Sequence, residues 1–260
     1  MIIDHEKRLA GHMNLLKTVV MAYPYHPTDF MMISHPLVTS SVLPLEAFGD
    51  IAKDVFRRHG EIMGDFVMVN ERNFSYIVSY LFEKMMAGRT PEQMYALLNK
   101  TYCLDVLNVT KRWLTLSEYS NILRDAWMAC EWPGQMNTRD LVRMFKWADR
   151  SILMTATELA VYNMHLKNTA SVVLYRGIGL TVKNHERFVR KLSWTLDFEK
   201  ARWFATRHGS GVVYQAVISK PNAKVVLAYF DDRGESEVVI NPLSKSVSIW
   251  QVACFTAVEI

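Results

Sequence analysis

Three short polar segments in the last third of the chain could together carry chemistry: an arginine, a pair of hydroxyls and a pair of carboxylates. They read Tyr175-Arg176-Gly177, Ser193-Trp194-Thr195 and Glu235-Ser236-Glu237. Each lies among apolar residues, where a polar group must be matched by a partner or it destabilises the fold. This order of arginine, serine and glutamate suits a site that holds a dinucleotide and breaks a glycosidic bond.

The arginine follows Val-Val-Leu-Tyr and precedes a glycine, which predicts that Arg176 lies at the end of a strand. A guanidinium mounted there is rigid, permanently charged and able to bind a phosphate through two N–H groups. Gly177 has no side chain, so its backbone could approach a ligand closely. Taken alone, such an arginine is more often a structural group that pairs with a carboxylate in the sheet.

The hydroxyl segment predicts a strand with Ser193 and Thr195 on one face and Trp194 on the other, because side chains alternate along a strand. Two hydroxyls on one face could hold a ribose or a carboxylate in place. Taken alone, they are more often ordinary strand residues on a solvated face.

The two glutamates flank a single residue, so the same alternation predicts that Glu235 and Glu237 point to one face, into a groove. Like charges this close raise each other's proton affinity unless a cation offsets them. A carboxylate beside a sugar could stabilise developing positive charge and accept a hydrogen bond from a 2-hydroxyl. The structural alternative is a solvated pair at a sheet edge beside Arg233.

Together the segments resemble the arginine–serine–glutamate class of mono-ADP-ribosyltransferases. The resemblance rests on Leu-Tyr-Arg-Gly, on Leu-Ser-Trp-Thr-Leu-Asp-Phe-Glu-Lys-Ala-Arg-Trp-Phe-Ala and on Gly-Glu-Ser-Glu-Val-Val-Ile. It covers residues 174–240 and is similar in order, in spacing and in the helix after the serine motif. As a joint pattern it is fairly specific, whereas each piece alone is weak.

The resemblance implies NAD as co-substrate and a binding site for it. It implies that Arg176 holds a phosphate or ribose of NAD, that the Gly177 backbone binds the nicotinamide amide, and that Ser193 positions the nicotinamide ribose. Tyr175 and Thr195 complete the expected NAD-binding set.

The resemblance also implies a catalytic set made of Glu237, Glu235, Arg176 and Ser193. Glu237 would bind the ribose 2′-hydroxyl and favour departure of nicotinamide, and Glu235 would orient or deprotonate the acceptor. Trp194 stands where threonine is common in the family, which we expect to alter packing more than chemistry. No metal is expected, since the sequence shows no ligand cluster for one.

Members that resemble this chain in size include bacterial and phage toxins of toxin–antitoxin and anti-phage systems. The acceptor stays open between protein arginine, which a glutamate at position 235 favours, and RNA or DNA, which the basic charge favours. The chain could bind an antitoxin through its helical or proline-rich N-terminal region. Two alternatives remain: an NAD glycohydrolase on the same scaffold, and a non-catalytic module that binds nucleotides or nucleic acid.

Composition indicates a folded protein with a mild basic excess: 260 residues, half of them apolar, and a net charge of +4. Between Ser171 and Ser210, eight Lys and Arg stand against three Asp and Glu, which favours a phosphate-bearing ligand near the proposed site. The three scattered cysteines form no C-x-x-C pair, so free thiols are expected. The sequence shows no signal peptide and no membrane span, so we expect a cytoplasmic protein without membrane contact.

The apolar spacing changes from helical to alternating near residue 165, which predicts an α+β fold. We expect a helical N-terminal region over residues 1–135, for target or partner binding, with an irregular proline-rich segment before Leu45. Residues 136–260 are expected to form an ADP-ribosyltransferase-like split antiparallel β-sandwich as the catalytic domain. Its long first helix would start at Thr138 and reach Met164. The predicted strands are Val172–Arg176, Arg190–Thr195, Gly211–Ile218, Lys224–Ala228, Glu237–Ile240 and Val247–Ala257.

Overall fold

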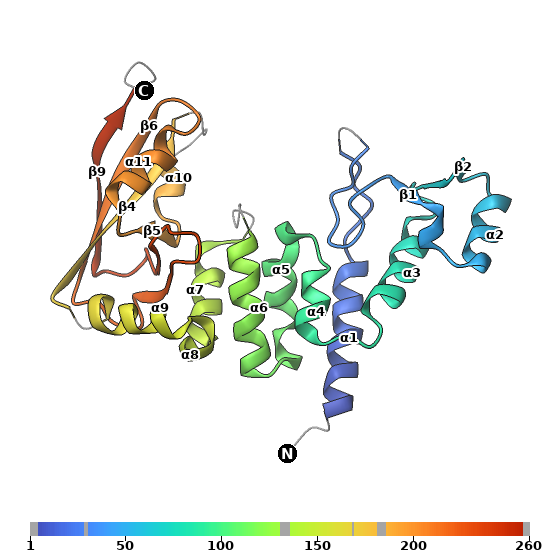
Figure 1. Cartoon of the computed structure of the whole chain (residues 1–260), viewed down its shortest axis with the longest axis horizontal. Helices are drawn as coiled ribbons and strands as arrows, with labels where there is room; N and C mark the ends of the chain where they lie inside the picture. The colour runs from blue at the N-terminus through green and yellow to red at the C-terminus, as the bar shows by residue number, and fades with distance from the viewer. Residues whose placement is uncertain (1–4, 29–30, 131–135, 168, 181–185, 257–260) are drawn as a thin grey trace. The chain divides into compact units, whose positions relative to one another are not determined.

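Helices dominate the first half of the chain and a six-stranded sheet dominates the second, as the apolar spacing predicts (Figure 1). This computed structural model describes residues 5–28, 31–130, 136–167, 169–180 and 186–256. The chain divides into two compact units, which we call unit 1 (residues 1–133) and unit 2 (residues 134–260). The boundary expected after residue 135 lies close to this division along the chain.

The helices of unit 1 bury most of the apolar residues that recur at helical spacing, although Ile51 is 82% exposed. These helices are α1 (His5–Met21), α2 (Asp50–Arg58), α3 (Phe74–Met86), α4 (Pro91–Ala96), α5 (Lys100–Thr110) and α6 (Leu116–Ala129), with 3-10 turns η1 (Leu45–Ala47) and η2 (Lys111–Trp113). Helix α4 begins with a capping box: the Thr90 side chain accepts from the backbone of Gln93, and the Gln93 side chain accepts from the backbone of Thr90. Gly60 follows α2 with a φ of 67°, as a residue that ends a helix should.

Unit 1 also contains a small sheet that the sequence did not predict. Its strands are β1 (Val42–Pro44), β2 (Ile62–Met63) and β3 (Phe66–Met68), antiparallel in the order β1-β3-β2. The prediction of helices, with an irregular segment before Leu45, did not include these strands. Strands of two or three residues are too short for an alternating pattern to be visible, which is why the spacing of apolar residues missed them.

The long helix expected from Thr138 to Met164 is also wrong. The structure has shorter pieces instead: α7 (Thr138–Trp147), α8 (Arg150–Leu153), α9 (Ala156–Val161) and a π-helical turn, η4 (Tyr162–Leu166). Ala148 and Met154 are extended, and the side chains of Asp149 and Thr155 cap the pieces that follow. Local capping thus starts new helices within one apolar pattern.

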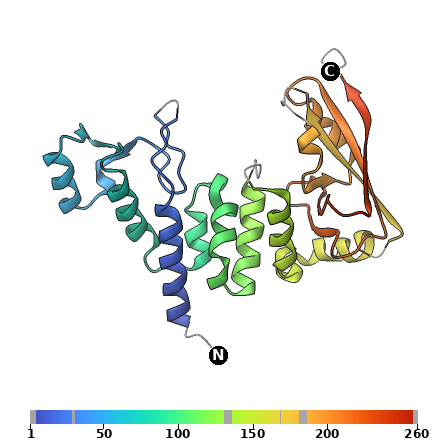
Figure 2. The same cartoon turned by 180° about the vertical axis from the view of Figure 1, so that it is seen from behind.

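The sheet of unit 2 is antiparallel and has the strand order β7-β8-β5-β4-β6-β9; Figure 2 shows these strands from behind. The strands are β4 (Ser171–Gly179), β5 (Ser193–Thr195), β6 (Gly211–Ser219), β7 (Val226–Phe230), β8 (Glu237–Ile240) and β9 (Val247–Phe255). Each contains part or all of a predicted strand; residue 257, where the last was expected to end, lies outside the described residues. A single registered pair, Tyr175 with Thr195, joins β4 to β5, so these two strands are paired over a shorter length than the others in this sheet.

Two helices accompany this sheet: α10 (Glu186–Val189) and α11 (Phe198–Thr206). Helix α11 is capped by Asp197, whose side chain accepts hydrogen bonds from the backbone of Glu199 and Lys200. Ala201 and Ala205 of α11 pack against Val213 of β6. Among the described residues, no helix is both long and apolar enough to cross a membrane.

Candidate functional site

Three of the polar residues, far apart in the sequence, lie on three adjacent strands of unit 2: Tyr175, Thr195 and Glu237. Strand β5 lies between β8 and β4. Thr195 pairs with Glu237 on one side and with Tyr175 on the other, so these three residues form one row across the sheet. Residues directly opposite each other on paired strands share a face. The sheet topology therefore places a carboxylate, a hydroxyl and an aromatic ring side by side.

Arg176 links the segments beside this row through hydrogen bonds to backbone oxygens. By alternation its side chain leaves β4 on the face opposite to Tyr175. Its Nε donates to the backbone oxygen of Phe188 at 2.9 Å, and its Nη1 donates to the backbone oxygen of Ser193. Burial lowers the pKa of Arg176 to about 10, while the negative charge of Glu237 acts in the opposite direction. The guanidinium is thus charged at neutral pH and lies within the field of that carboxylate.

The hydroxyl segment alternates as predicted. Trp194 is 2% exposed, and its indole N–H donates to the backbone oxygen of Lys191 at 2.9 Å, so it belongs to the packing of the opposite face. The hydroxyl of Thr195 donates to the backbone oxygen of Glu235 at 2.7 Å and accepts from the backbone N–H of Asp197 at 3.0 Å. Thr195 therefore ties the glutamate segment to the start of α11.

Gly177 allows a helix to pack directly on its strand, which was not predicted from the sequence. A Cβ atom at this position would come within 1.8 Å of the backbone oxygen of Ala201, and one at Gly211 would come within 2.0 Å of that of Ala205. The missing side chains let α11 lie directly on β4 and β6. The space beside the Gly177 Cα is thus filled by a helix, and any ligand contact there is left to the peptide groups.

The two glutamates lie close together, but not because side chains alternate along a strand, as was predicted. Strand β8 begins at Glu237, and Gly234 and Ser236 have positive φ values of 61° and 45°, so Glu235 belongs to a turn and not to the strand. Arg233 joins the two acids: its Nη2 lies 2.9 Å from Oε2 of Glu235 and 3.5 Å from Oε2 of Glu237. The cation that two close carboxylates require is therefore supplied from the same turn.

This carboxylate turn, residues 231–237, becomes more enclosed toward the strand. The side chain of Arg233 is 43% exposed, that of Glu235 is 23% exposed and that of Glu237 is 6% exposed. The burial of a charged carboxylate at a strand start is costly unless cations or donors surround it. Arg233 and Arg176 both act on Glu237 as cations.

The backbone of the carboxylate turn is fixed by residues that the sequence reading missed. The Asp231 carboxylate accepts from the backbone N–H of Ser236 at 2.8 Å, and the N–H of Gly234 donates to the Asp231 backbone oxygen at 2.9 Å. The carboxylate of Glu158, in α9 and 4% exposed, accepts from the N–H of Asp231 at 2.9 Å. An Asp that opens a Gly-containing turn is a recognisable signal for the first of these residues. Glu158 gave no signal in the sequence.

The surface of unit 2 is hollowed elsewhere, at the start of α7. The hollow is lined by Asn137, Thr138, Arg139, Asp140, Arg143 and Leu243. None of the candidate residues lines it, so it is separate from the row on β8, β5 and β4. Within the described ranges, no group of three His, Cys, Asp or Glu side chains could hold a metal ion.

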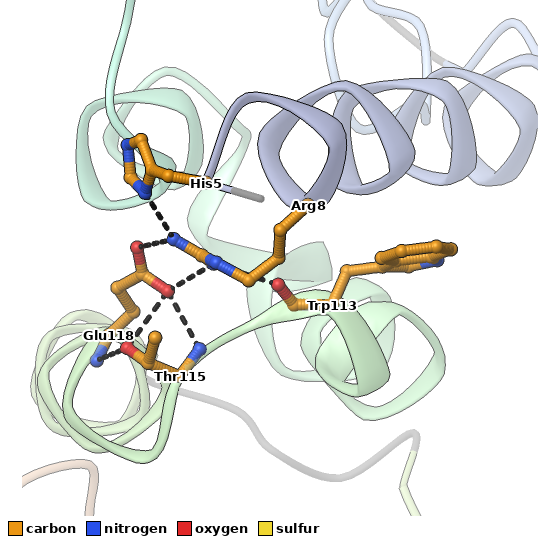
Figure 3. Close-up of polar contacts among 5 residues, drawn as sticks. All are labelled: His5, Arg8, Trp113, Thr115 and Glu118. Atoms are coloured by element: carbon orange, nitrogen blue, oxygen red, sulfur yellow. Dashed lines mark hydrogen bonds and ion pairs between the residues drawn. The ribbon is translucent and has the colours of Figure 1, made fainter. Parts of the chain in front are cut away.

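Unit 1 holds a second arginine–carboxylate cluster, drawn in Figure 3. Arg8 of α1 binds both carboxylate oxygens of Glu118, at 2.6 and 2.7 Å, and donates to the backbone oxygen of Trp113 at 2.8 Å. Glu118 also closes the capping box of α6 with Thr115. Burial would raise the pKa of Glu118, but the hydrogen bonds from Arg8 and Thr115 outweigh it and lower that pKa. This cluster fastens α1 to α6.

Comparison of the chain with known protein families, with curated proteins and with solved structures gives no match. The assignment of a function therefore depends on the geometry of the site and on the residue pattern itself.

Proposed function

We propose that this chain is an NAD-dependent mono-ADP-ribosyltransferase that cleaves the nicotinamide–ribose bond and transfers ADP-ribose to a macromolecule. The observation that carries the proposal is the pairing of β8, β5 and β4, which puts Glu237, Thr195 and Tyr175 in one row. Ser193 lies two residues before Thr195 on β5, and its backbone oxygen accepts from Arg176, whose side chain leaves β4 on the opposite face of the sheet. The motif pattern requires Arg176, Ser193 and Glu237 to lie near one another, and the pairing of their three strands supports the proposal.

The chemistry fits the groups in the row. Nicotinamide in NAD is a cationic leaving group, so the site must hold the dinucleotide and stabilise positive charge at C1′ as the bond breaks. Glu237 supplies a negative charge for that centre and an acceptor for the ribose 2′-hydroxyl. Ser193 supplies a hydroxyl for the ribose, and the local basic excess favours the diphosphate. Arg176 contributes its positive charge, while its hydrogen bonds to backbone oxygens hold the strand ends beside the site.

Access to Glu237 must change for this reaction to occur. Its side chain is 6% exposed and lies beside the more exposed side chain of Arg233. A ribose hydroxyl can reach the carboxylate when the Arg233 guanidinium moves aside. The anchors of the turn described above are backbone groups and the side chains of Asp231 and Thr195, so this movement leaves the turn in place.

The remaining parts of the proposal concern partners and compartment. We propose RNA, DNA or a protein arginine as the acceptor, and unit 1 with its proline-rich segment as the region that binds a target or an antitoxin. A toxin of a toxin–antitoxin or anti-phage system fits a chain in which one unit binds a partner and the other carries the catalytic site. The cytoplasm is the compartment that supplies NAD to such an enzyme.

The test is release of nicotinamide from labelled NAD by the purified chain, with and without cell lysate, followed by digestion with protease or nuclease. Glu237→Gln should lower release by about a hundredfold or more, as expected for loss of a preorganised charge. The matched control is Glu199→Gln, which changes an exposed glutamate of α11 that pairs with Arg202 at 3.4 Å. Control and wild type should release nicotinamide at similar rates.

The same assay separates the alternatives. Nicotinamide release without label on protein or nucleic acid would identify a glycohydrolase with water as acceptor. NAD that binds without being cleaved would identify a non-catalytic nucleotide-binding module. Wild-type and Glu237→Gln chains with equal release would show that this carboxylate has no part in the reaction.

A further inference from the structure

Arg233 occupies the position in which an acceptor would have to lie. Its Nη2 is 2.9 Å from the carboxylate of Glu235, the residue placed to orient or deprotonate an acceptor, and 3.5 Å from that of Glu237, the residue placed at the ribose. The guanidinium therefore spans from the acceptor side of the site to the ribose side. Its side chain is 43% exposed, so it can exchange contacts without unpacking a core.

We propose that Arg233 is itself a modification site, ADP-ribosylated by the chain that carries it, and that this event closes the site. The inference rests on the proposed function, because it needs NAD cleavage at Glu237. A nucleophile tethered beside the reacting centre competes at a high effective concentration with acceptors from solution. Arg233 is tethered in this way, three residues before the end of its own turn.

The movement that admits a ribose also prepares the acceptor. When the guanidinium leaves the carboxylate of Glu237, its shorter contact, to Glu235, can persist. The backbone of Glu235 stays fixed because its oxygen accepts the Thr195 hydroxyl at 2.7 Å. Arg233 is thereby held by one carboxylate next to the place where the other meets the ribose.

The step balances without a further reactant. The bond between C1′ of the ribose and the nicotinamide nitrogen breaks, and its electron pair leaves with nicotinamide. A guanidinium nitrogen of Arg233 forms the new bond to C1′. The proton that this nitrogen loses passes to the carboxylate of Glu235 and then to water. The products are an ADP-ribosylated arginine, nicotinamide and a proton.

The product would block further turnover. An ADP-ribose group on Arg233 carries two phosphates and a nucleoside and is tethered where the next NAD must bind. We therefore expect a burst of nicotinamide release that decays as Arg233 becomes modified. Two other arginine–glutamate contacts lack this placement: Arg202 pairs with Glu199 on the outside of α11, and Arg8 is enclosed in unit 1 with a side chain that is 14% exposed.

The experiment incubates the purified full chain with labelled NAD and follows nicotinamide release and protein labelling together. Peptide mass spectrometry then maps the modified residue in the wild-type chain. We expect one ADP-ribose on Arg233 in most chains, with a labelling rate per chain that is unchanged by an about tenfold dilution, as an intramolecular step requires. Arg202→Lys, the matched control, should keep the label.

The mapping in the wild-type chain decides the inference, whatever Arg233→Lys does to the rate. Nicotinamide release with Arg233 unmodified would overturn the inference and leave the proposed function standing. Labelling that slows in proportion to dilution would also overturn it, because the transfer would then be between chains. Absence of nicotinamide release from the wild type would overturn both. In Arg233→Lys we expect loss of the label and of the decay that follows the burst.

Discussion

Each unit of the chain holds an arginine between carboxylate oxygens, but the two clusters differ in how firmly they are held. In unit 1, Arg8 donates hydrogen bonds to both carboxylate oxygens of Glu118, at 2.6 and 2.7 Å, and the two side chains are 14% and 15% exposed. In unit 2, one nitrogen of Arg233 faces two different carboxylates at 2.9 and 3.5 Å. The first arrangement is a forked pair and the second is a single cation shared by two acids.

The difference separates an ion pair that holds two helices together from one that suits the proposed site. In unit 1, Arg8 and Glu118 bind each other. Arg8 also binds the backbone of Trp113, and Glu118 binds the backbone of Thr115, so both side chains serve the fold. In unit 2 the two carboxylates share one cation for charge compensation, whereas the side chain of Arg233 is partly exposed to solvent. An exposed arginine over a nearly buried carboxylate is easily displaced, which is what a substrate site requires.

The largest effect should come from a steric test of the two units. Gly177→Ala should destabilise unit 2 by about 3–4 kcal/mol, because the new Cβ would meet the backbone oxygen of Ala201 at 1.8 Å. The matched change in unit 1 is Gly11→Ala, whose Cβ would meet the Trp113 ring at 2.7 Å. A side chain can shift and alanine favours a helix, so this change should cost about 1 kcal/mol or less.

Thermal and urea unfolding of both glycine variants provide the measurement. Similar losses for Gly177→Ala and Gly11→Ala would mean that α11 is not fixed against β4 by backbone contact. The glycine motif would then need another explanation, and close approach of a ligand to its peptide group would be the first to consider.

The next effect separates the two arginine clusters directly. Arg8→Met should cost about 3 kcal/mol of unfolding free energy, because it leaves the enclosed carboxylate of Glu118 without its cation. Arg233→Met should cost about 1 kcal/mol or less, because that arginine is exposed and Arg176 still acts on Glu237. Urea unfolding of each variant measures both. Equal costs would break the distinction between a fastened and a displaceable arginine.

The sequence predicted the sheet of unit 2 well because its signals are local. Strand β8 begins and ends at the predicted residues, and Asp197 caps α11. Alternation along β5 correctly separates Trp194 from its two neighbours, because a strand enforces a period of two. The apolar pattern alone could therefore place the arginine and hydroxyl segments on strands, and Glu237 at the start of a third.

The carboxylate turn could not be predicted in the same way. The reading of Glu235 and Glu237 as strand neighbours failed because Ser236 has a positive φ, which non-glycine residues seldom adopt and which no pattern announces. Glu158, some seventy residues away in sequence, supports the turn through Asp231 at 2.9 Å. Contacts of this kind depend on the three-dimensional fold, so spacing within a segment carries no trace of them.

A pH test should show a further contrast, since unit 1 contains an enclosed histidine. Burial lowers the pKa of His12 from 6.5 to about 4, and within the described residues neither ring nitrogen has a hydrogen-bond partner. The unfolded chain binds a proton near pH 6.5 and the folded unit only near pH 4. His12 should therefore cause no loss of stability above pH 6.5 and a loss of about 2 kcal/mol at pH 5. Burial also lowers the pKa of His35 to about 4, so that residue should add to the loss.

Hydrogen exchange followed by mass spectrometry resolves this effect within unit 1. Peptides of α1 should lose protection between pH 6.5 and 4 after correction for the intrinsic exchange rate. His12→Phe keeps an aromatic ring but has no group to protonate, so its α1 peptides should lose less. The same pH dependence in the variant would assign the loss to other groups.

The smallest effect should come from the anchor of the carboxylate turn and would sharpen the view that its backbone is fixed while Arg233 is mobile. Asp231→Ala removes the acceptor of the Ser236 N–H at 2.8 Å, so unfolding should cost about 1–1.5 kcal/mol. Nicotinamide release should fall about tenfold, because a small misplacement of a catalytic group is costly in rate. Asp231→Asn keeps an acceptor oxygen and should recover most of the release. Asp232→Ala changes the exposed neighbour and should leave release near that of the wild type. If Asp231→Ala lost stability but kept full release, the turn would support the fold without positioning Glu235 and Glu237.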